Sequence, residues 1–176
     1  MSITIKIFVF LVFALEMMKL NMRTVCFTGH RKIPPKRMTS LARRLRTEII
    51  ELIDKGYLYF GTGGALGFDT LAAQTVLDLK SDYPQIKLIL VLPCLSQADS
   101  WSSDDKSIYE AIKTNADKVV YISREYTKEC MHKRNRHLVD NSSACICYLT
   151  EKTGGTAYTV EYANSKGLLV INTAEK

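Results

Sequence analysis

The sequence predicts a single α/β domain in which a mainly parallel β-sheet is flanked by helices in three layers. Two observations predict this fold class. From Met22 onward, short apolar runs typical of buried strands alternate with segments whose apolar residues recur at helical spacing. The connections between them are short, as in βαβ units. A chain of 176 residues that is 47% hydrophobic and 24% charged is long enough to bury one sizeable core.

The first half of the domain begins with an apolar strand at 23–28. Apolar residues spaced three to four apart between Leu41 and Ile53 then predict a helix, which Gly56 ends as a residue suited to positive φ. A second strand at 57–60 precedes a glycine-rich loop, and a second helix follows at 70–80.

The second half continues the alternation. Pro84 ends the second helix, and the run at 86–92, apolar except for Lys87, is typical of a buried central strand. The elements that follow are a helix at 104–115, a strand at 118–122, a helix at 131–140, a strand at 144–149, a helix at 156–166 and a strand at 168–172.

Residues 1–21 are a separate question. They contain an apolar run at 7–15, which is too short to span a bilayer and has no small-residue cleavage site after it. We expect the functional domain to cover 22–176 and the first 21 residues to be a non-functional leader, without stable membrane insertion. A weak membrane-surface anchor is the competing interpretation.

The composition limits the function classes. A net charge of +6 favours anionic partners, although basic runs on helices are usually solvated. Five cysteines without a C-x-x-C pair indicate neither a zinc site nor a disulfide framework, and we expect no metal. This cysteine usage is typical of a reducing cytoplasm. The sequence leaves the oligomeric state open, a homo-oligomer included.

The glycine-rich loop carries the central hypothesis. Gly61, Gly63, Gly64 and Gly67 lie within seven residues, directly before a helix. Glycine exposes backbone N–H groups, and the N-terminus of a helix favours an anion. We therefore expect a phosphate-bearing, nucleotide-like ligand here, with Asp69 meeting a ribose hydroxyl or capping the helix. A purely steric role for the glycines is the alternative.

The carboxyl ends of parallel strands meet at one edge of a sheet, where open α/β sheets bind ligands. The segments that should converge there are 28–31, 61–69, the loop from 93 to 101, and 154–156. The residues predicted to bind the ligand are Thr28, Gly29, His30, Arg31, Gly63, Gly64, Gly67, Asp69, Trp101, Arg134, Asn135, Gly154, Gly155 and Thr156.

Individual residues suit a ligand in different ways. The planar guanidinium of Arg31 can hold a phosphate by two hydrogen bonds, with an exposed basic loop as the alternative. A lone histidine such as His30 is more often a hydrogen-bonding partner than an acid or base. Thr156 can both cap its helix and bind phosphate. Glu161 either faces the cleft or is an exposed carboxylate, and Trp101 either stacks on a base or packs on the core.

From Met22 to its end the chain resembles the YpsA/YoqJ-like family of the SLOG superfamily, Rossmann-like relatives of the LOG and DprA proteins. The motifs that carry the resemblance are 27–31, 63–69, the Trp101 loop, 130–135 and Gly154-Gly155-Thr156. The resemblance implies a Rossmann-like domain that binds a nucleotide or nucleotide-derived molecule, such as NAD, ADP-ribose or a nucleoside phosphate, as a sensor. No cofactor beyond this ligand is implied.

The LOG branch implies an enzymatic alternative. Its phosphoribohydrolases cleave the N-glycosidic bond of nucleoside 5′-monophosphates, using an Arg in M-H-E-R-K and a Glu in P-G-G-x-G-T-x-x-E. By this resemblance, Arg134 would hold phosphate and Glu161 would stabilise the oxocarbenium ion or activate water. The chain departs from these motifs in Asn135, which replaces Lys, and in the missing Pro and G-T of the second. The DprA relatives imply nucleic-acid binding as a third alternative, which the positive charge supports.

Overall fold

The computed structural model describes residues 23–174, and residues 1–21, the expected leader, lie outside them. The strands are β1 (Thr24–Gly29), β2 (Tyr59–Thr62), β3 (Lys87–Leu92), β4 (Lys118–Tyr121), β5 (Ala144–Tyr148) and β6 (Leu169–Asn172). The helices are α2 (Pro35–Asp54), α3 (Phe68–Leu79), α4 (Ser103–Asn115), α5 (Cys130–Asp140) and α6 (Gly155–Ser165). The strands form one sheet in which every pairing is parallel, so the predicted fold class is confirmed.

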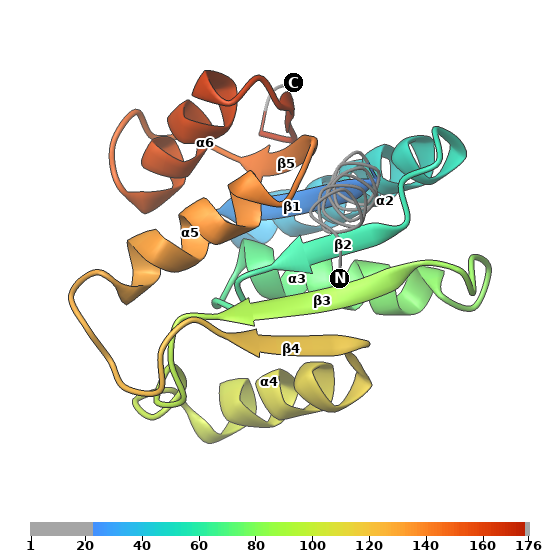
Figure 1. The fold of residues 1–176 in the computed structure, drawn as a ribbon. Helices are drawn as coiled ribbons and strands as arrows, with labels where there is room; N and C mark the ends of the chain where they lie inside the picture. The colour runs from blue at the N-terminus through green and yellow to red at the C-terminus, as the bar shows by residue number, and fades with distance from the viewer. Residues whose placement is uncertain (1–22, 175–176) are drawn as a thin grey trace, which may run out of the picture.

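The sheet has the strand order β4-β3-β2-β1-β5-β6. The chain therefore builds outward from β1 to β4 and then returns to place β5 on the other side of β1. Helices α2 and α3 lie on one face of the sheet, and α5 and α6 lie on the other (Figure 1). The connections that leave β1 and β5 thus run to opposite faces, which opens a crevice between the carboxyl ends of these two strands.

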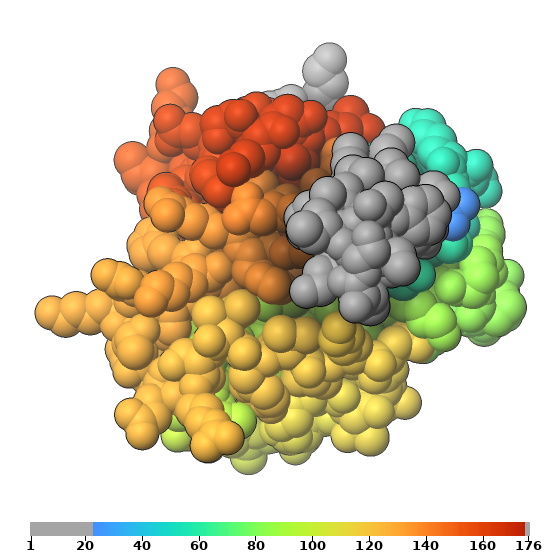
Figure 2. Space-filling view, in the orientation of Figure 1, coloured from blue at the N-terminus to red at the C-terminus, as the bar shows by residue number. Residues whose placement is uncertain are grey.

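Two clusters of buried side chains form the core, one on each face of the sheet. Leu41, Leu45 and Ile49 of α2 are almost completely buried against the first cluster, as their spacing of four residues predicts. Leu138 of α5 and Val160 of α6 belong to the second cluster. Figure 2 shows the atoms of α5 and α6 packed side by side, in orange and red.

The glycine-rich loop begins later than the sequence pattern predicts. Strand β2 runs to Thr62, because Gly61 and Thr62 continue the parallel ladder with Ile89 and Leu90 of β3. Leu138 of α5 packs over Gly61, where a Cβ would lie 3.0 Å from Leu138 Cδ2. The lack of a side chain at Gly61 therefore serves the contact between the sheet and α5.

The five cysteines lie within the described residues, where all are buried free thiols. Between residues 23 and 174, no helix has the length and apolar character needed to cross a membrane. Nor do the described residues bring together three or more His, Cys, Asp or Glu side chains that could hold a metal ion.

Candidate functional site

A cavity of about 350 Å³ opens at the crevice between β1 and β5. The predicted ligand-binding residues that line it are Thr28, Gly29, His30, Arg31, Asp69, Arg134, Asn135, Gly155 and Thr156. They come from the end of β1, the first turn of α3, and the N-terminal turns of α5 and α6. The topology of the sheet thus brings segments far apart in the sequence to one place.

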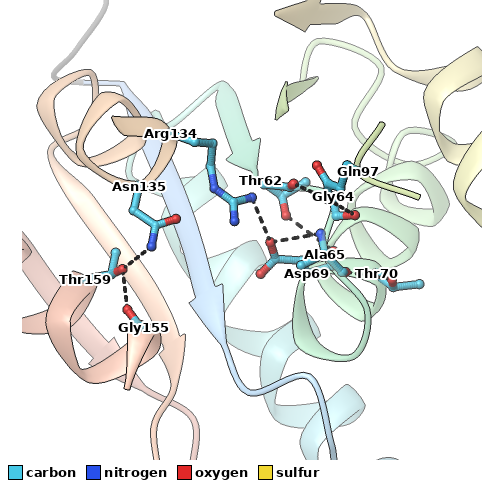
Figure 3. Close-up of polar contacts among 11 residues, drawn as sticks. Thr62, Gly64, Ala65, Asp69, Thr70, Gln97, Arg134, Asn135, Gly155 and Thr159 are labelled. Atoms are coloured by element: carbon cyan, nitrogen blue, oxygen red, sulfur yellow. Dashed lines mark hydrogen bonds and ion pairs between the residues drawn. The ribbon is translucent and has the colours of Figure 1, made fainter. Parts of the chain in front are cut away.

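Arg134 is the most unusual side chain in this cavity. It belongs to α5, its side chain is only 8% exposed, and Nη1 lies 3.8 Å from Oδ2 of Asp69 (Figure 3). Its Nε and Nη1 atoms have no hydrogen-bond partner among the described residues. Buried donors without a partner are costly, and burial lowers the pKa of this guanidinium while the charge of Asp69 opposes the shift. The cavity therefore contains a buried cation with unused donors.

Asp69 occupies the place that the sequence predicts for a phosphate. It lies in the first turn of α3, and its Oδ2 accepts a hydrogen bond of 3.3 Å from the backbone N–H of Ala65 in the glycine-rich loop. Burial raises the pKa of this carboxyl group, and the neighbouring Arg134 opposes that shift. Since a protein carboxylate already uses this N–H, the position best suited to a ligand anion is beside Arg134.

Gly63, Gly64 and Gly67 do not line the cavity, and two of them have clear steric reasons to be glycine. A Cβ on Gly63 would lie 1.4 Å from Nη1 of Arg134, and one on Gly67, whose φ is +79°, would lie 2.2 Å from the Arg31 carbonyl oxygen. Gln97 holds the loop by donating hydrogen bonds of 3.2 and 2.9 Å to the carbonyl oxygens of Gly63 and Gly64. Direct ligand contacts by these glycines stay a prediction.

The N-terminus of α6 offers free donors to the same cavity. Gly154 precedes it with a φ of 93°, no side chain caps it, and its first turn has no acidic residue. A Cβ on Gly155 would meet nothing within 4 Å, so the backbone there is open. Asn135 donates to Thr159 Oγ1 at 2.9 Å, and Thr159 donates to the carbonyl oxygen of Gly155 at 2.7 Å (Figure 3). These bonds fix the start of α6 against α5, with N–H groups suited to an anion.

His30 connects the loop after β1 to the loop after β5, and both loops border the crevice. Its Nε2 accepts a hydrogen bond of 2.9 Å from the backbone N–H of Thr150, and its ring packs edge-on against Tyr148 at 5.8 Å. This geometry favours the role of a hydrogen-bonding partner over that of an acid or base. Trp101 packs edge-on against Tyr109 at 5.3 Å and does not line the cavity.

Glu161 is exposed and does not line the cavity. The residues of α6 that do so are Gly155, Thr156 and Thr159, and the sequence analysis did not select Thr159. A signal for it exists: if the G-T pair of the LOG motif is matched to Gly155-Thr156, the glutamate of the motif falls on Thr159. Met131, one turn before Arg134, also lines the cavity and was not selected as a ligand-binding residue.

Comparisons with known proteins agree with this architecture. Residues 26–168 match the sequence model of the YpsA family, described as the YspA SLOG family. A UPF0398 protein of Bacillus cereus is 32% identical over 130 residues, which are 72% of this chain and 71% of that protein. A UPF0398 protein of Bacillus thuringiensis is similar to the same extent.

Solved structures of DNA processing protein A share the fold. The protein from Helicobacter pylori, whose structure concerns its single-stranded DNA binding mode, has a TM-score of 0.61 and 18% sequence identity. The match covers 88% of this chain and 66% of that one. The protein from Streptococcus pneumoniae has a TM-score of 0.63 and 20% identity, with 89% and 51% of the two chains covered.

Proposed function

The chain belongs to the YpsA family of SLOG proteins, and on this premise we propose that it binds a nucleotide or nucleotide-derived molecule through an anionic group held by Arg134. The observation that carries the proposal is the buried guanidinium with two nitrogen atoms that lack hydrogen-bond partners among the described residues. A phosphate in the cavity beside Arg134 would bring a hydrogen-bond acceptor to this guanidinium and add a second negative charge to that of Asp69.

The rest of the cavity supports a ligand of this kind. Its volume of about 350 Å³ falls at the lower end of the range of small-molecule sites, roughly 300–1,000 Å³. The open N-terminus of α6, at Gly155 and Thr156, would give backbone N–H groups to the same phosphate. The apolar side chains of Phe27, Met131 and Leu138 also line the cavity and would contact the less polar parts of the ligand.

The test is thermal unfolding of the full chain with ribose 5-phosphate, the four ribonucleoside 5′-monophosphates, NAD and ADP-ribose. A ligand at 100 times its Kd adds about 2.7 kcal/mol of stability, which is roughly 5–10 °C in Tm for a domain of this size. We expect such a rise for at least one compound, and we expect the Arg134→Met variant to lose it.

The matched control is Arg136→Met, because Arg136 lies on the same helix with its guanidinium in solvent, bonded to Tyr158. It removes the same charge and should keep the ligand-induced rise in Tm. A rise that persists in Arg134→Met, or no rise with any compound, would overturn the proposal.

Single-stranded nucleic acid is the competing ligand, and one observation favours it: residues 31–47 contain many basic residues and no acidic one. Nucleic-acid binding would show as an affinity for oligonucleotides that falls steeply with salt concentration. The DprA structures themselves are less than 25% identical to this chain and show the fold alone.

A further inference from the structure

The segment from Arg31 to Thr47 carries a concentrated positive charge next to the cavity. It contains no Asp or Glu, and its basic residues are Arg31, Lys32, Lys36, Arg37, Arg43, Arg44 and Arg46. Arg44 pairs with Glu48 at 3.7 Å and Arg46 with Asp82 at 3.3 Å. The other basic residues of the segment have no ion-pair partner among the described residues. Their charge is therefore available to an anion from outside the domain.

Five of the basic side chains line two hollows that share lining residues with the cavity or with each other and that together form a surface groove: Arg31, Lys32, Lys36, Arg37 and Arg44. A second hollow, of about 630 Å³, shares His30 and Arg31 with the cavity of Arg134 and is also lined by Lys32, Lys36 and Arg37. A third, of about 250 Å³, shares Arg37 with the second and adds Arg44. Arg37 and Arg44 are seven residues apart and thus lie on the same face of α2. A line of cations leads from Arg134 past Arg31 onto α2.

The charged side chains in the first turn of α2 are unfavourable for the dipole of this helix. Lys36 and Arg37 stand there, no acidic residue accompanies them, and no side chain caps the helix after Pro34. Cations at a helix N-terminus are unfavourable unless an anion lies beside them. One carboxylate, Glu151, lines the second hollow and is exposed.

We propose that this groove is a second phosphate-binding subsite, so that the ligand of the Arg134 cavity carries two or more linked phosphates rather than one. The inference rests on the proposed function. One anionic group binds at Arg134, and the phosphate chain passes Arg31 to reach Lys36 and Arg37. The buried, unpartnered guanidinium of Arg134 provides the anchor at the inner end of the groove.

The lining of the groove favours phosphates over the bases of a single strand. Stacking of bases needs exposed aromatic faces. Two aromatic rings line the outer hollows. Tyr148 is 3% exposed and packs against Phe68, and the ring of His30 packs edge-on against Tyr148. The groove therefore offers charge without a stacking platform.

The test compares mono- and polyphosphates by isothermal titration with EDTA, so that magnesium does not bind the probes. The probes are the four ribonucleoside 5′-monophosphates, the corresponding triphosphates, and ADP-ribose. We expect the wild-type chain to bind a polyphosphate at least about tenfold more tightly than its monophosphate, which corresponds to roughly 1.4 kcal/mol. The Lys36→Ala/Arg37→Ala variant should lose this gain while its affinity for the monophosphate changes little.

The control variant is Arg43→Ala/Lys55→Ala, which removes two charges from the same helix. Arg43 lines a separate hollow with Gln74 and Asp78, and Lys55 caps the far end of α2. The control variant should keep the higher affinity for polyphosphates, and Glu151→Gln should increase that affinity further. The inference would be overturned if a monophosphate bound as tightly as its polyphosphates, or if the higher affinity for polyphosphates persisted in Lys36→Ala/Arg37→Ala. Either result would leave the proposed function intact.

Two other outcomes have separate meanings. No binding of any mono- or polyphosphate would overturn the proposed function and this inference together. Binding of an oligothymidylate that is tighter than that of every triphosphate, and that Lys36→Ala/Arg37→Ala abolishes, would assign the groove to single-stranded nucleic acid and overturn the assignment to a small ligand.

Discussion

Nη1 of Arg134 lies 3.8 Å from Oδ2 of Asp69, close enough for an ion pair but too far for a hydrogen bond. Both side chains are less than 10% exposed, and burial is the largest cause of both pKa shifts, upward for Asp69 and downward for Arg134. The mutual attraction therefore does not fully offset the cost of removing the two charges from water. An anion in the cavity would accept hydrogen bonds from Arg134, which Asp69 does not do at this distance.

Removal of Arg134 alone should be strongly destabilising. In Arg134→Met the carboxylate of Asp69 stays buried without its partner, a change that typically costs about 3–5 kcal/mol. The double variant Arg134→Met/Asp69→Asn should recover most of this loss, because no buried charge remains. Urea unfolding of both variants and of Asp69→Asn measures the coupling. If the effects of the two substitutions simply add, the two side chains do not form an interacting pair.

The stability of Arg134→Met should also depend on pH. Burial holds the pKa of Asp69 above its usual value of 3.8, and loss of Arg134 removes the attraction that opposes this shift. A carboxyl group whose pKa is raised in the folded state stabilises the folded protein at pH values below its unfolded-state pKa. This contribution is lost as the pH rises through the folded-state pKa. The free energy of unfolding of Arg134→Met should thus increase from pH 8 to pH 5. Arg134→Met/Asp69→Asn should lack this increase.

Two glycine substitutions should have different consequences. In Gly63→Ala the new methyl group would overlap the guanidinium of Arg134, at 1.4 Å from Nη1. We expect a loss of about 1–3 kcal/mol in stability, as for other overpacked sites, together with loss of ligand binding. In Gly155→Ala the methyl group meets nothing within 4 Å.

Gly155→Ala should therefore fold with unchanged or slightly higher stability, since glycine in a helix is unfavourable relative to alanine. Its methyl group would nonetheless project at the open N-terminus of α6, and ligand affinity should fall. Chemical denaturation and titration with the best ligand of the thermal screen measure the two effects separately. Full affinity in Gly155→Ala would show that the ligand does not contact this turn.

Asp117 should contribute to stability in a way that acid removes. Its carboxylate accepts hydrogen bonds from Lys80, Lys87 and the backbone N–H of Leu88, at 2.8, 3.2 and 2.8 Å. Burial raises the pKa of Asp117, but the hydrogen bonds from Lys80, Leu88 and Lys87 outweigh it, so the net shift is downward.

A carboxyl group whose pKa is lower in the folded state stabilises the folded protein at pH values above its unfolded-state pKa. This contribution is lost as the pH falls through the folded-state pKa. Between pH 5 and pH 2, wild type should thus lose more stability than Asp117→Asn, as urea unfolding at each pH would show. Equal losses in the two proteins would mean that these hydrogen bonds do not favour the charged form.

The sequence predicts the layers of this fold well because the apolar residues of α2 follow the helical period and those of β3 form the nearly continuous run of a buried central strand. The site is harder to predict because it depends on which faces of α5 and α6 meet. Glu161 and Thr159 are two positions apart on α6, about 200° around the helix, so that only Thr159 faces the cavity. Likewise, the sequence shows that glycines precede α3, but not that Asp69 folds back to accept a hydrogen bond from the N–H of Ala65 in the same loop.

The placement of carboxylates gives a test between binding and hydrolysis. Asp69 is the one acidic residue among the described residues that line the cavity, and its hydrogen bond to Ala65 and its ion pair with Arg134 hold it in place. The cavity therefore lacks the free second carboxylate that glycoside hydrolysis ordinarily uses. We expect no release of ribose 5-phosphate from the four ribonucleoside 5′-monophosphates, and we expect Glu161→Gln to bind ligand as tightly as wild type.

Chromatographic analysis of the nucleotides after prolonged incubation measures release of the free base, and Arg134→Met controls for a contaminating hydrolase. Base release that Glu161→Gln abolishes would contradict the outward position of this side chain and favour the enzymatic alternative. Release that persists in Glu161→Gln but is lost in Asp69→Asn would make the Asp69 carboxylate the catalytic group, and would replace the proposed binding function with catalysis at the same cavity.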